Sequence, residues 1–260
     1  MENQEIKYFY LDTIPNLYDT EIRNHFWKPN QSIVRGLYQL LDKKKIKEKI
    51  IDVGCGLGDQ IFPNSTHILD KDLIFDPKDK IFIDFDLDFD VFQFEKGHFN
   101  FVYCRHTLED IQNPQHAFQE ITKLSKSGYI ETPSPMVELS KYVDCFIGEK
   151  LDYRGYIHHR YIVWSDYKTN TIYFLPKLSI IEHLTFKKQE LYNGILNLYP
   201  IYWNNYYYWD QNKIPNIVVY RHGLNYDIKN DYIQLLNIAV EKSMEYTRYF
   251  MIYLQEEKVI

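Results

Sequence analysis

The fold is decided by residues 50–62, which read IIDVGCGLGDQIF. An apolar run that contains one acid, Asp52, ends in glycines at every second position, Gly54, Gly56 and Gly58. Apolar, β-branched residues favour a buried strand. Glycine permits the backbone angles of a tight turn that a ligand can approach closely. The stretch therefore predicts a strand that ends at a ligand-binding turn.

Apolar segments on both sides of this stretch predict the rest of the core. A helix is expected up to about residue 45, with Ser32 as its cap and one apolar face made of Ile33, Leu37, Leu40 and Leu41. Asn113 and Pro114 open another helix, because the missing N–H of proline is harmless there. Short strands are expected within KIIDVG, THILD, KIFIDF, FNFVYC and SGYIETP. Strands that alternate with turns and helical connections predict an α/β fold with a doubly wound, mainly parallel sheet.

The character of the chain changes after Pro135. HRYIVWSDYKTNTIYFLP predicts two strands around a polar turn, and YWNNYYYWDQNKIPNIVVYRHG predicts two more. We therefore expect a helical segment (1–46), a ligand-binding core (47–135) and a hairpin-rich region (136–260) that completes the sheet and packs with the core as one unit. The last region should end in a helix whose apolar positions are Ile233, Leu236, Ile238, Val240 and Met244.

Composition and charge exclude several classes of protein. The chain has 260 residues, of which 45% are hydrophobic and 25% charged, as is typical of a folded globular protein. A net charge of -6 weighs against nucleic-acid binding. No apolar run approaches the roughly 20 residues that span a bilayer, and the start MENQEIKYFYLD lacks the pattern of a secretory signal. We expect a cytoplasmic protein without a membrane partner. The three cysteines, Cys55, Cys104 and Cys145, are odd in number and widely spaced. They indicate neither a disulfide framework nor a zinc cluster.

The spacing of the glycines leaves open which ligand the turn holds. A dinucleotide-binding turn carries a further glycine or alanine three residues after Gly56, and that position is Asp59. An acid there would repel a pyrophosphate, which such a turn binds through N–H donors and the positive end of a helix dipole. The pattern therefore disfavours NAD and favours a ligand that carries positive charge.

The same stretch carries a family resemblance. IIDVGCGLG resembles motif I of the class I S-adenosylmethionine-dependent methyltransferases, and HILD, DFDLDF and FNFVYCRHTLEDIQNPQHAFQEITKLSKSGYIETPSP resemble the segments that follow it in that family. The likeness covers about residues 48–135 and points to small-molecule, type 11-like members. Asn100, Asp110 and Tyr129 depart from the usual pattern, which has an acid, a histidine and a second glycine there.

The resemblance implies a Rossmann-like fold and S-adenosyl-L-methionine as the cofactor. It implies that Asp70, or Asp72 as an alternative, binds the ribose hydroxyls, and that Asp86 and Leu87 contact the adenine. The full set of cofactor-binding residues that we expect is Asp52, Gly54, Cys55, Gly56, Gly58, Asp70, Lys71, Asp86, Leu87 and Arg105.

Methyl transfer to a hydroxyl needs a base near the methyl group, and histidine suits that role because its pKa lies near neutrality. Arg105 and His106 follow the fourth strand, and YRGYIHHRYIVW holds the adjacent pair His158 and His159. On a strand this pair would face opposite sides, so one of the two would face the pocket. The predicted catalytic residues are His158, His159, His106 and Arg105. A metal site that combines His158 or His159 with acids is an open alternative, but the spacing does not indicate one and no metal is predicted.

The acceptor is expected to be a small polar molecule, such as a sugar or glycan precursor, methylated on oxygen. Tyrosine and tryptophan in YPIYWNNYYYWD can stack on a sugar ring, although such a tract is as often the interior of a hairpin. The arginines near the pocket suit an acidic group. The alternatives are a binding or partner subunit that uses the same fold, and methylation of a protein or nucleic acid. The sequence does not indicate an oligomeric state.

Overall fold

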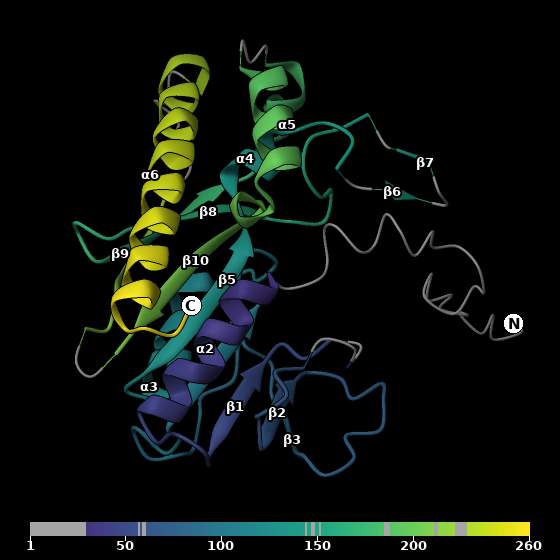
Figure 1. The fold of residues 1–260 in the computed structure, drawn as a ribbon. Helices are drawn as coiled ribbons and strands as arrows, with labels where there is room; N and C mark the ends of the chain where they lie inside the picture. The colour runs from purple at the N-terminus through teal and green to yellow at the C-terminus, as the bar shows by residue number, and fades with distance from the viewer. Residues whose placement is uncertain are drawn as a thin grey trace, which may run out of the picture.

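The central feature of the protein, in a computed structural model, is one six-stranded sheet with the strand order β10-β5-β4-β1-β2-β3 (Figure 1). The structure describes residues 30–260 except 57, 59–60, 144, 147–148, 151, 185–187, 211–212 and 222–227. Five strands are parallel and β10 is antiparallel to β5. This confirms the predicted mainly parallel sheet. The strands are β1 Ile50–Val53, β2 His67–Asp70, β3 Ile81–Asp84, β4 Phe101–Arg105, β5 Gly128–Pro133 and β10 Asn204–Trp209.

Helices α2 (Gln31–Lys43) and α3 (Pro114–Leu124) cover this sheet, with α2 crossing in front of it and α3 behind in Figure 1. The predicted apolar face of α2 is buried. Its cap is Asn30 and not Ser32, because the Asn30 side chain accepts hydrogen bonds from two backbone N–H groups of the first turn. The predicted cap of α3 is confirmed, since the Asn113 side chain accepts from the backbone N–H of His116.

The connections between the parallel strands differ from the expected alternation with helices. Among the residues that the structure describes, α3 is the only helix between β1 and β5, and turns or loops join β1 to β2, β2 to β3 and β3 to β4. The predicted glycine turn thus continues into an irregular segment. The segment is held to β1 by a hydrogen bond from the Phe62 N–H to the Asp52 carboxylate, at 2.6 Å.

The last part of the chain builds a second sheet, with the order β11-β9-β8. β8 (Tyr161–Asp166) and β9 (Thr171–Pro176) form the predicted hairpin. The two further predicted strands are present as β10 and β11 (Asn216–Val219). They do not pair with each other, because β10 pairs with β5 and β11 pairs in parallel with β9.

Asn205 joins the two sheets. Its side chain donates to the hydroxyls of Thr132 on β5 and Ser165 on β8, and accepts from the Ser165 N–H at 3.0 Å. The long helix α6 (Ile228–Glu256) runs beside both sheets (Figure 1). Leu236 and Val240 are buried as predicted, whereas Ile238 is exposed. One apolar core reaches from α2 to the end of the chain, and a second lies beneath the β8–β9 hairpin.

Shorter helices and strands complete the fold. None of the described helices is long and apolar enough to cross a membrane. The remaining elements are α4 Pro135–Leu139, β6 Cys145–Phe146, β7 Glu149–Lys150, the 3-10 helices η2 Ser179–His183 and η3 Pro200–Trp203, and α5 Gln189–Leu198.

Candidate active site

The strand order reverses between β1 and β4, and in sheets of this kind a ligand is expected at the carboxyl ends of the strands at such a reversal. We call this place the crevice. The glycine turn follows β1, and residues 105–110 end β4 and follow it. Gly54 has a φ of +77, and a Cβ on it would lie 1.9 Å from the Thr107 hydroxyl oxygen. Glycine is therefore required at this position twice over, by the backbone angle and by the contact. The contact places the turn directly against the segment after β4.

The other two glycines of the turn also have positive φ angles, +51 at Gly56 and +80 at Gly58. A Cβ on Gly58 would collide with the Phe75 ring at 2.6 Å, whereas one on Gly56 would meet nothing within 4 Å. Gly56 is thus the glycine of the turn that faces open space. Asp59, on which the argument against a dinucleotide rests, lies outside the described residues.

Asp52 stabilises the segment that follows the turn through its hydrogen bond with the Phe62 N–H. Its side chain is 3% exposed, and burial raises its pKa from 3.8 to about 7 despite the Phe62 hydrogen bond and the charge of Arg105. Cys55 is buried as well, and burial followed by the charge of Asp70 raises the pKa of its thiol to about 12. Both side chains are thus buried beside the turn, where Asp52 accepts a hydrogen bond from the Phe62 N–H.

Asp70 ends β2 at the predicted place. One carboxylate oxygen accepts from the Gly56 N–H and the other from the Lys71 N–H, each at 2.8 Å. Lys71 and Asp72 are exposed. Asp70 therefore lies at the mouth of the glycine turn, with a second lone pair on each oxygen for a ligand hydroxyl.

Asp86 and Leu87 follow β3. The Asp86 carboxylate accepts from the Asp88 N–H at 2.9 Å within a local turn. Leu87 is 5% exposed and packs into the apolar core, so its side chain leaves little surface for the predicted adenine contact.

Arg105 ends β4 inside the sheet and not in the crevice. Its Nε donates to Glu131, its register partner on β5, at 2.8 Å, and both side chains are buried. The Tyr129 hydroxyl also donates to Glu131. Removing either member of this pair would leave the other charge buried without its partner, which would lower the stability of the fold. The geometry gives Arg105 a role in positioning Glu131, in place of the cofactor or catalytic contact expected from the sequence.

His106 is the first residue beyond β4, and its backbone is in the left-handed region with a φ of +49. Its N–H donates to the Glu131 carbonyl at 2.8 Å. The Asn204 amide donates to the Glu131 carboxylate at 2.7 Å, so the Asn204 oxygen faces His106 Nε2 at 3.2 Å. That nitrogen must therefore carry the proton. Burial, then the charge of Arg105, holds the pKa of His106 well below its usual value, which makes Nδ1 the unprotonated nitrogen.

His158 and His159 precede β8 and are not on a strand, so the predicted alternation of faces does not apply. The two side chains still differ sharply, with 48% of His158 exposed against 3% of His159. His159 Nδ1 lies 2.7 Å from the carboxylate of Glu138, on α4, which Lys177 also contacts at 2.6 Å. Burial lowers the pKa of His159, but the charge and hydrogen bond of Glu138 outweigh it and raise the pKa.

Glu109 brings the separate histidine segments together. The Oε1 atom of Glu109 lies 3.7 Å from His106 Nδ1 and 4.0 Å from His159 Nε2. The Glu109 carbonyl also accepts from the N–H groups of Arg160 and Tyr161, which ties the start of β8 to this segment. Burial raises the pKa of Glu109 to about 8, against the lowering effect of His159. The crevice thus holds a buried acid between two imidazoles.

Several members of this cluster are not predicted from the sequence. Glu109 and Glu131 lie in RHTLED and ETPSP, at or just after predicted strand ends. An acid at such a place could have indicated a site residue. Glu138, Lys177 and Asn204 carry no motif. Arg154, expected near an acidic substrate, is buried and donates to the carbonyls of Leu139, Ile181 and Leu184. The aromatic tract is core as well, since Tyr206, Tyr207 and Trp209 are buried.

Comparisons with known proteins find similarity to methyltransferases. Residues 24–142 match a family model described as a methyltransferase domain. Among solved structures, the chain is similar to S-adenosylmethionine-dependent methyltransferases from Mesorhizobium loti (14% identity, 40% of this chain and 55% of that one, TM-score 0.30), Aquifex aeolicus (13%, 49% and 75%, 0.31) and Clostridium acetobutylicum (11%, 48% and 59%, 0.37). The chain spans about half the length of the first of these. No curated protein matches.

Proposed function

We propose that the protein is a class I S-adenosylmethionine-dependent methyltransferase that transfers a methyl group from S-adenosylmethionine to a hydroxyl of a small polar acceptor. The match of residues 24–142 to a methyltransferase-domain model supports this proposal. The proposal rests on the close approach of the Gly54 backbone to the Thr107 side chain, which leaves no room for a Cβ on Gly54. It sets a glycine turn suited to the cofactor against a buried cluster of His106, Glu109 and His159. A sugar or glycan precursor is one acceptor of this class.

The residues of the turn fit the cofactor. Gly56 leaves open space where any other residue would place a Cβ, and the Asp70 carboxylate stands beside it. The backbone of the turn and Asp70 would therefore hold the cofactor, which supplies an electrophilic methyl group on a sulfonium when it is bound. An acid at this place favours a ligand with hydroxyls and positive charge over a pyrophosphate.

His106 is the base that the geometry favours. Its Nε2–H is committed to Asn204, so Nδ1 is the nitrogen that can take a proton from an acceptor hydroxyl. The low pKa means that the imidazole is neutral, and thus competent as a base, across the physiological range. Glu131 orients His106 twice, through its carbonyl and through Asn204.

The first test is cofactor binding. Asparagine tolerates positive φ angles better than other side chains, so Gly56→Asn fills the open space with little strain. We expect calorimetry to show that the wild-type chain binds S-adenosylmethionine and that Gly56→Asn weakens binding at least tenfold. Gly97→Asn is the matched control, because Gly97 also has a positive φ and its nearest neighbour is 4.0 Å away, on Lys126.

Equal affinity for both variants and the wild type would refute the assignment of the turn. If the cofactor binds but no methylated product forms with a panel of sugars, phenols, peptides and nucleosides, the chain is a binding or partner subunit and the proposed activity is wrong.

A further inference from the structure

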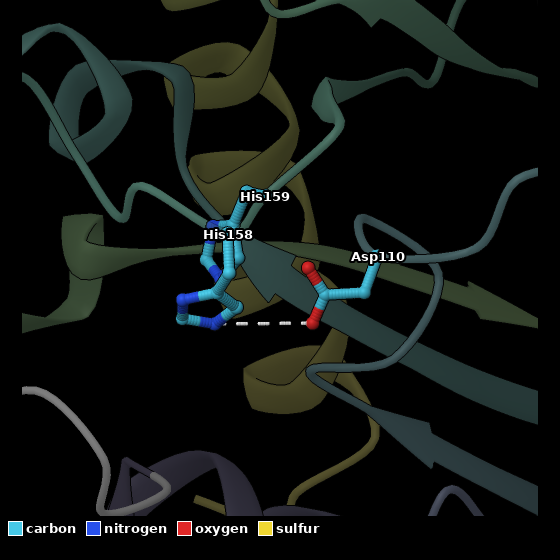
Figure 2. Close-up of side chains that lie close together, drawn as sticks. All are labelled: Asp110, His158 and His159. Carbon is cyan, nitrogen blue, oxygen red and sulfur yellow. Dashed lines mark ion pairs between the residues drawn. The ribbon is translucent and has the colours of Figure 1, made fainter. Parts of the chain in front are cut away.

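Three side chains at the rim of the crevice converge in a way that the methyl-transfer scheme does not use. Asp110, His158 and His159 each offer one ligand atom, and these atoms lie within 4.8 Å of one another. Figure 2 shows the two imidazoles beside the Asp110 carboxylate, with His158 Nε2 3.9 Å from an Asp110 oxygen. The two rings meet edge to face, at an interplanar angle of 78°. Asp110 comes from the segment after β4, and the histidines from the segment before β8.

The same place holds buried oxygens without hydrogen bonds. Among the described residues, neither carboxylate oxygen of Glu109, which is 1% exposed, has a hydrogen-bond partner, and neither does Oδ1 of Asp110. Buried polar atoms in folded proteins are nearly always satisfied, so three such oxygens in adjacent residues call for a missing cation or water. Lys177 does not meet this demand, because its ammonium is bound to Glu138 and to the Tyr156 carbonyl.

His159 is oriented as metal-bound histidines usually are. Glu138 is a buried carboxylate that contacts the Lys177 ammonium at 2.6 Å and lies 2.7 Å from His159 Nδ1. This directs Nε2 of His159 toward Glu109 and the cluster. A carboxylate on one ring nitrogen is the common arrangement that fixes the tautomer of a ligating histidine.

We propose that Asp110, His158 and His159 bind a divalent transition-metal ion, with Zn²⁺ as the best-suited ion. Two imidazole nitrogens and one carboxylate oxygen form a ligand set typical of catalytic zinc and related ions, and leave a position open for a further ligand. The ligands of a tetrahedral zinc site are about 3.4 Å apart. The 3.9 Å between His158 and Asp110 closes with a small rotation of His158, which is half exposed.

The ion would also balance charge. Glu138 is paired with Lys177 and His159, whereas Asp110 has no lysine or arginine partner within salt-bridge distance among the described residues. A divalent cation would give the Asp110 carboxylate a positive partner.

The role of the ion in catalysis rests on the proposed function. The open position would hold the acceptor hydroxyl, whose proton then passes to His106 Nδ1 as the new O–CH3 bond forms and the S–CH3 bond breaks with its electron pair left on sulfur. A Lewis acid at that oxygen lowers its pKa and fixes its position.

Direct metal binding tests the site without any need for activity. We expect the metal-free full-length chain to take one Zn²⁺ per chain from a chromogenic chelator. His158→Ala and Asp110→Asn should each weaken Zn²⁺ binding at least tenfold, since each removes one of three ligands. His116→Ala is the matched control, because His116 lies outside the cluster with its Nε2 on the Asp90 carbonyl, and it should bind Zn²⁺ as the wild type does.

Folding is controlled by the thermal midpoint of each variant, which should change little for His158→Ala because the side chain is exposed. Zn²⁺ affinity that is equal in the wild type and both ligand variants, or no binding by the wild type, would overturn the site. If Zn²⁺ binds as expected while S-adenosylmethionine does not, the metal site stands and the proposed methyl transfer fails.

Discussion

The histidine after β4 shows how one residue can be prepared for chemistry by its surroundings. His106 is held in a left-handed backbone conformation, which carries strain of about 1 kcal/mol for a residue other than glycine. Hydrogen bonds from its N–H to Glu131 and from its ring to Asn204 offset that strain. Both partners lie on strands next to His106, Glu131 on β5 and Asn204 on β10.

A substitution at position 106 can remove the basic nitrogen while it keeps the backbone conformation. Asparagine accepts positive φ angles and cannot act as a base at neutral pH, so His106→Asn should reduce kcat by about 10²–10⁴-fold. The affinity for S-adenosylmethionine should change less than about twofold, because the glycine turn is untouched. His116→Asn serves as the control. Unchanged kcat in His106→Asn would remove His106 from the proton transfer.

Asp52 predicts a pH effect on stability. Its pKa is raised from 3.8 to about 7 in the folded state, so the folded protein binds the proton more tightly than the unfolded chain. Stability from this group is complete below pH 4 and is lost as the pH rises through 7. The full loss above pH 7 amounts to about 4 kcal/mol at 1.36 kcal/mol per unit.

The isosteric variant Asp52→Asn tests this effect. Asparagine keeps an acceptor for the Phe62 N–H but does not ionise. Urea unfolding should therefore show the variant to be more stable than the wild type at pH 8, with the gain shrinking to near zero at pH 4. Parallel pH profiles of the two proteins would contradict the raised pKa.

At the scale of the element, β5 is the strand on which the two halves of the chain meet. It pairs with β4 on one side and with β10 on the other. At its start, Gly128 lies opposite Trp209, and a Cβ on Gly128 would come within 2.1 Å of the indole ring. Glycine is needed here for space, because its φ angle is an ordinary one.

Two glycine substitutions should therefore change stability in opposite directions. Gly128→Ala overpacks the buried indole and should lower the free energy of unfolding by about 1–3 kcal/mol. Gly194→Ala, in the exposed interior of α5 with nothing within 4 Å, should raise it by about 0.5–1 kcal/mol. Urea midpoints measure both. A Gly128→Ala protein as stable as Gly194→Ala would show that Trp209 moves aside at no cost.

At the scale of the whole molecule, strand order is what gathers the site. The reversal between β1 and β4 brings the glycine turn against residues 105–110. The second sheet then delivers His158 and His159 to the same place, through the hydrogen bonds of Arg160 and Tyr161 to Glu109. Residues from three distant parts of the chain thus share one crevice.

The sequence by itself determined the glycine turn, the five parallel strands and the cap of α3. These depend on residues next to one another, through backbone angles that glycine or proline allows and through runs of apolar side chains. That is why Gly54 and Gly58 stand where a side chain would collide, and why Asn113 caps its helix.

Only the tertiary structure decided which charged residues stabilise the fold and which lie at the candidate active site. The sequence predicts catalytic and cofactor-binding roles for Arg105, yet its side chain is buried against Glu131. Arg154 is buried as well and donates to backbone carbonyls. Glu109 carried no predicted role, yet it lies buried between His106 and His159. Such pairings depend on distances across the sheets and on the loss of water around each charge, and neither quantity is present in the order of residues along the chain.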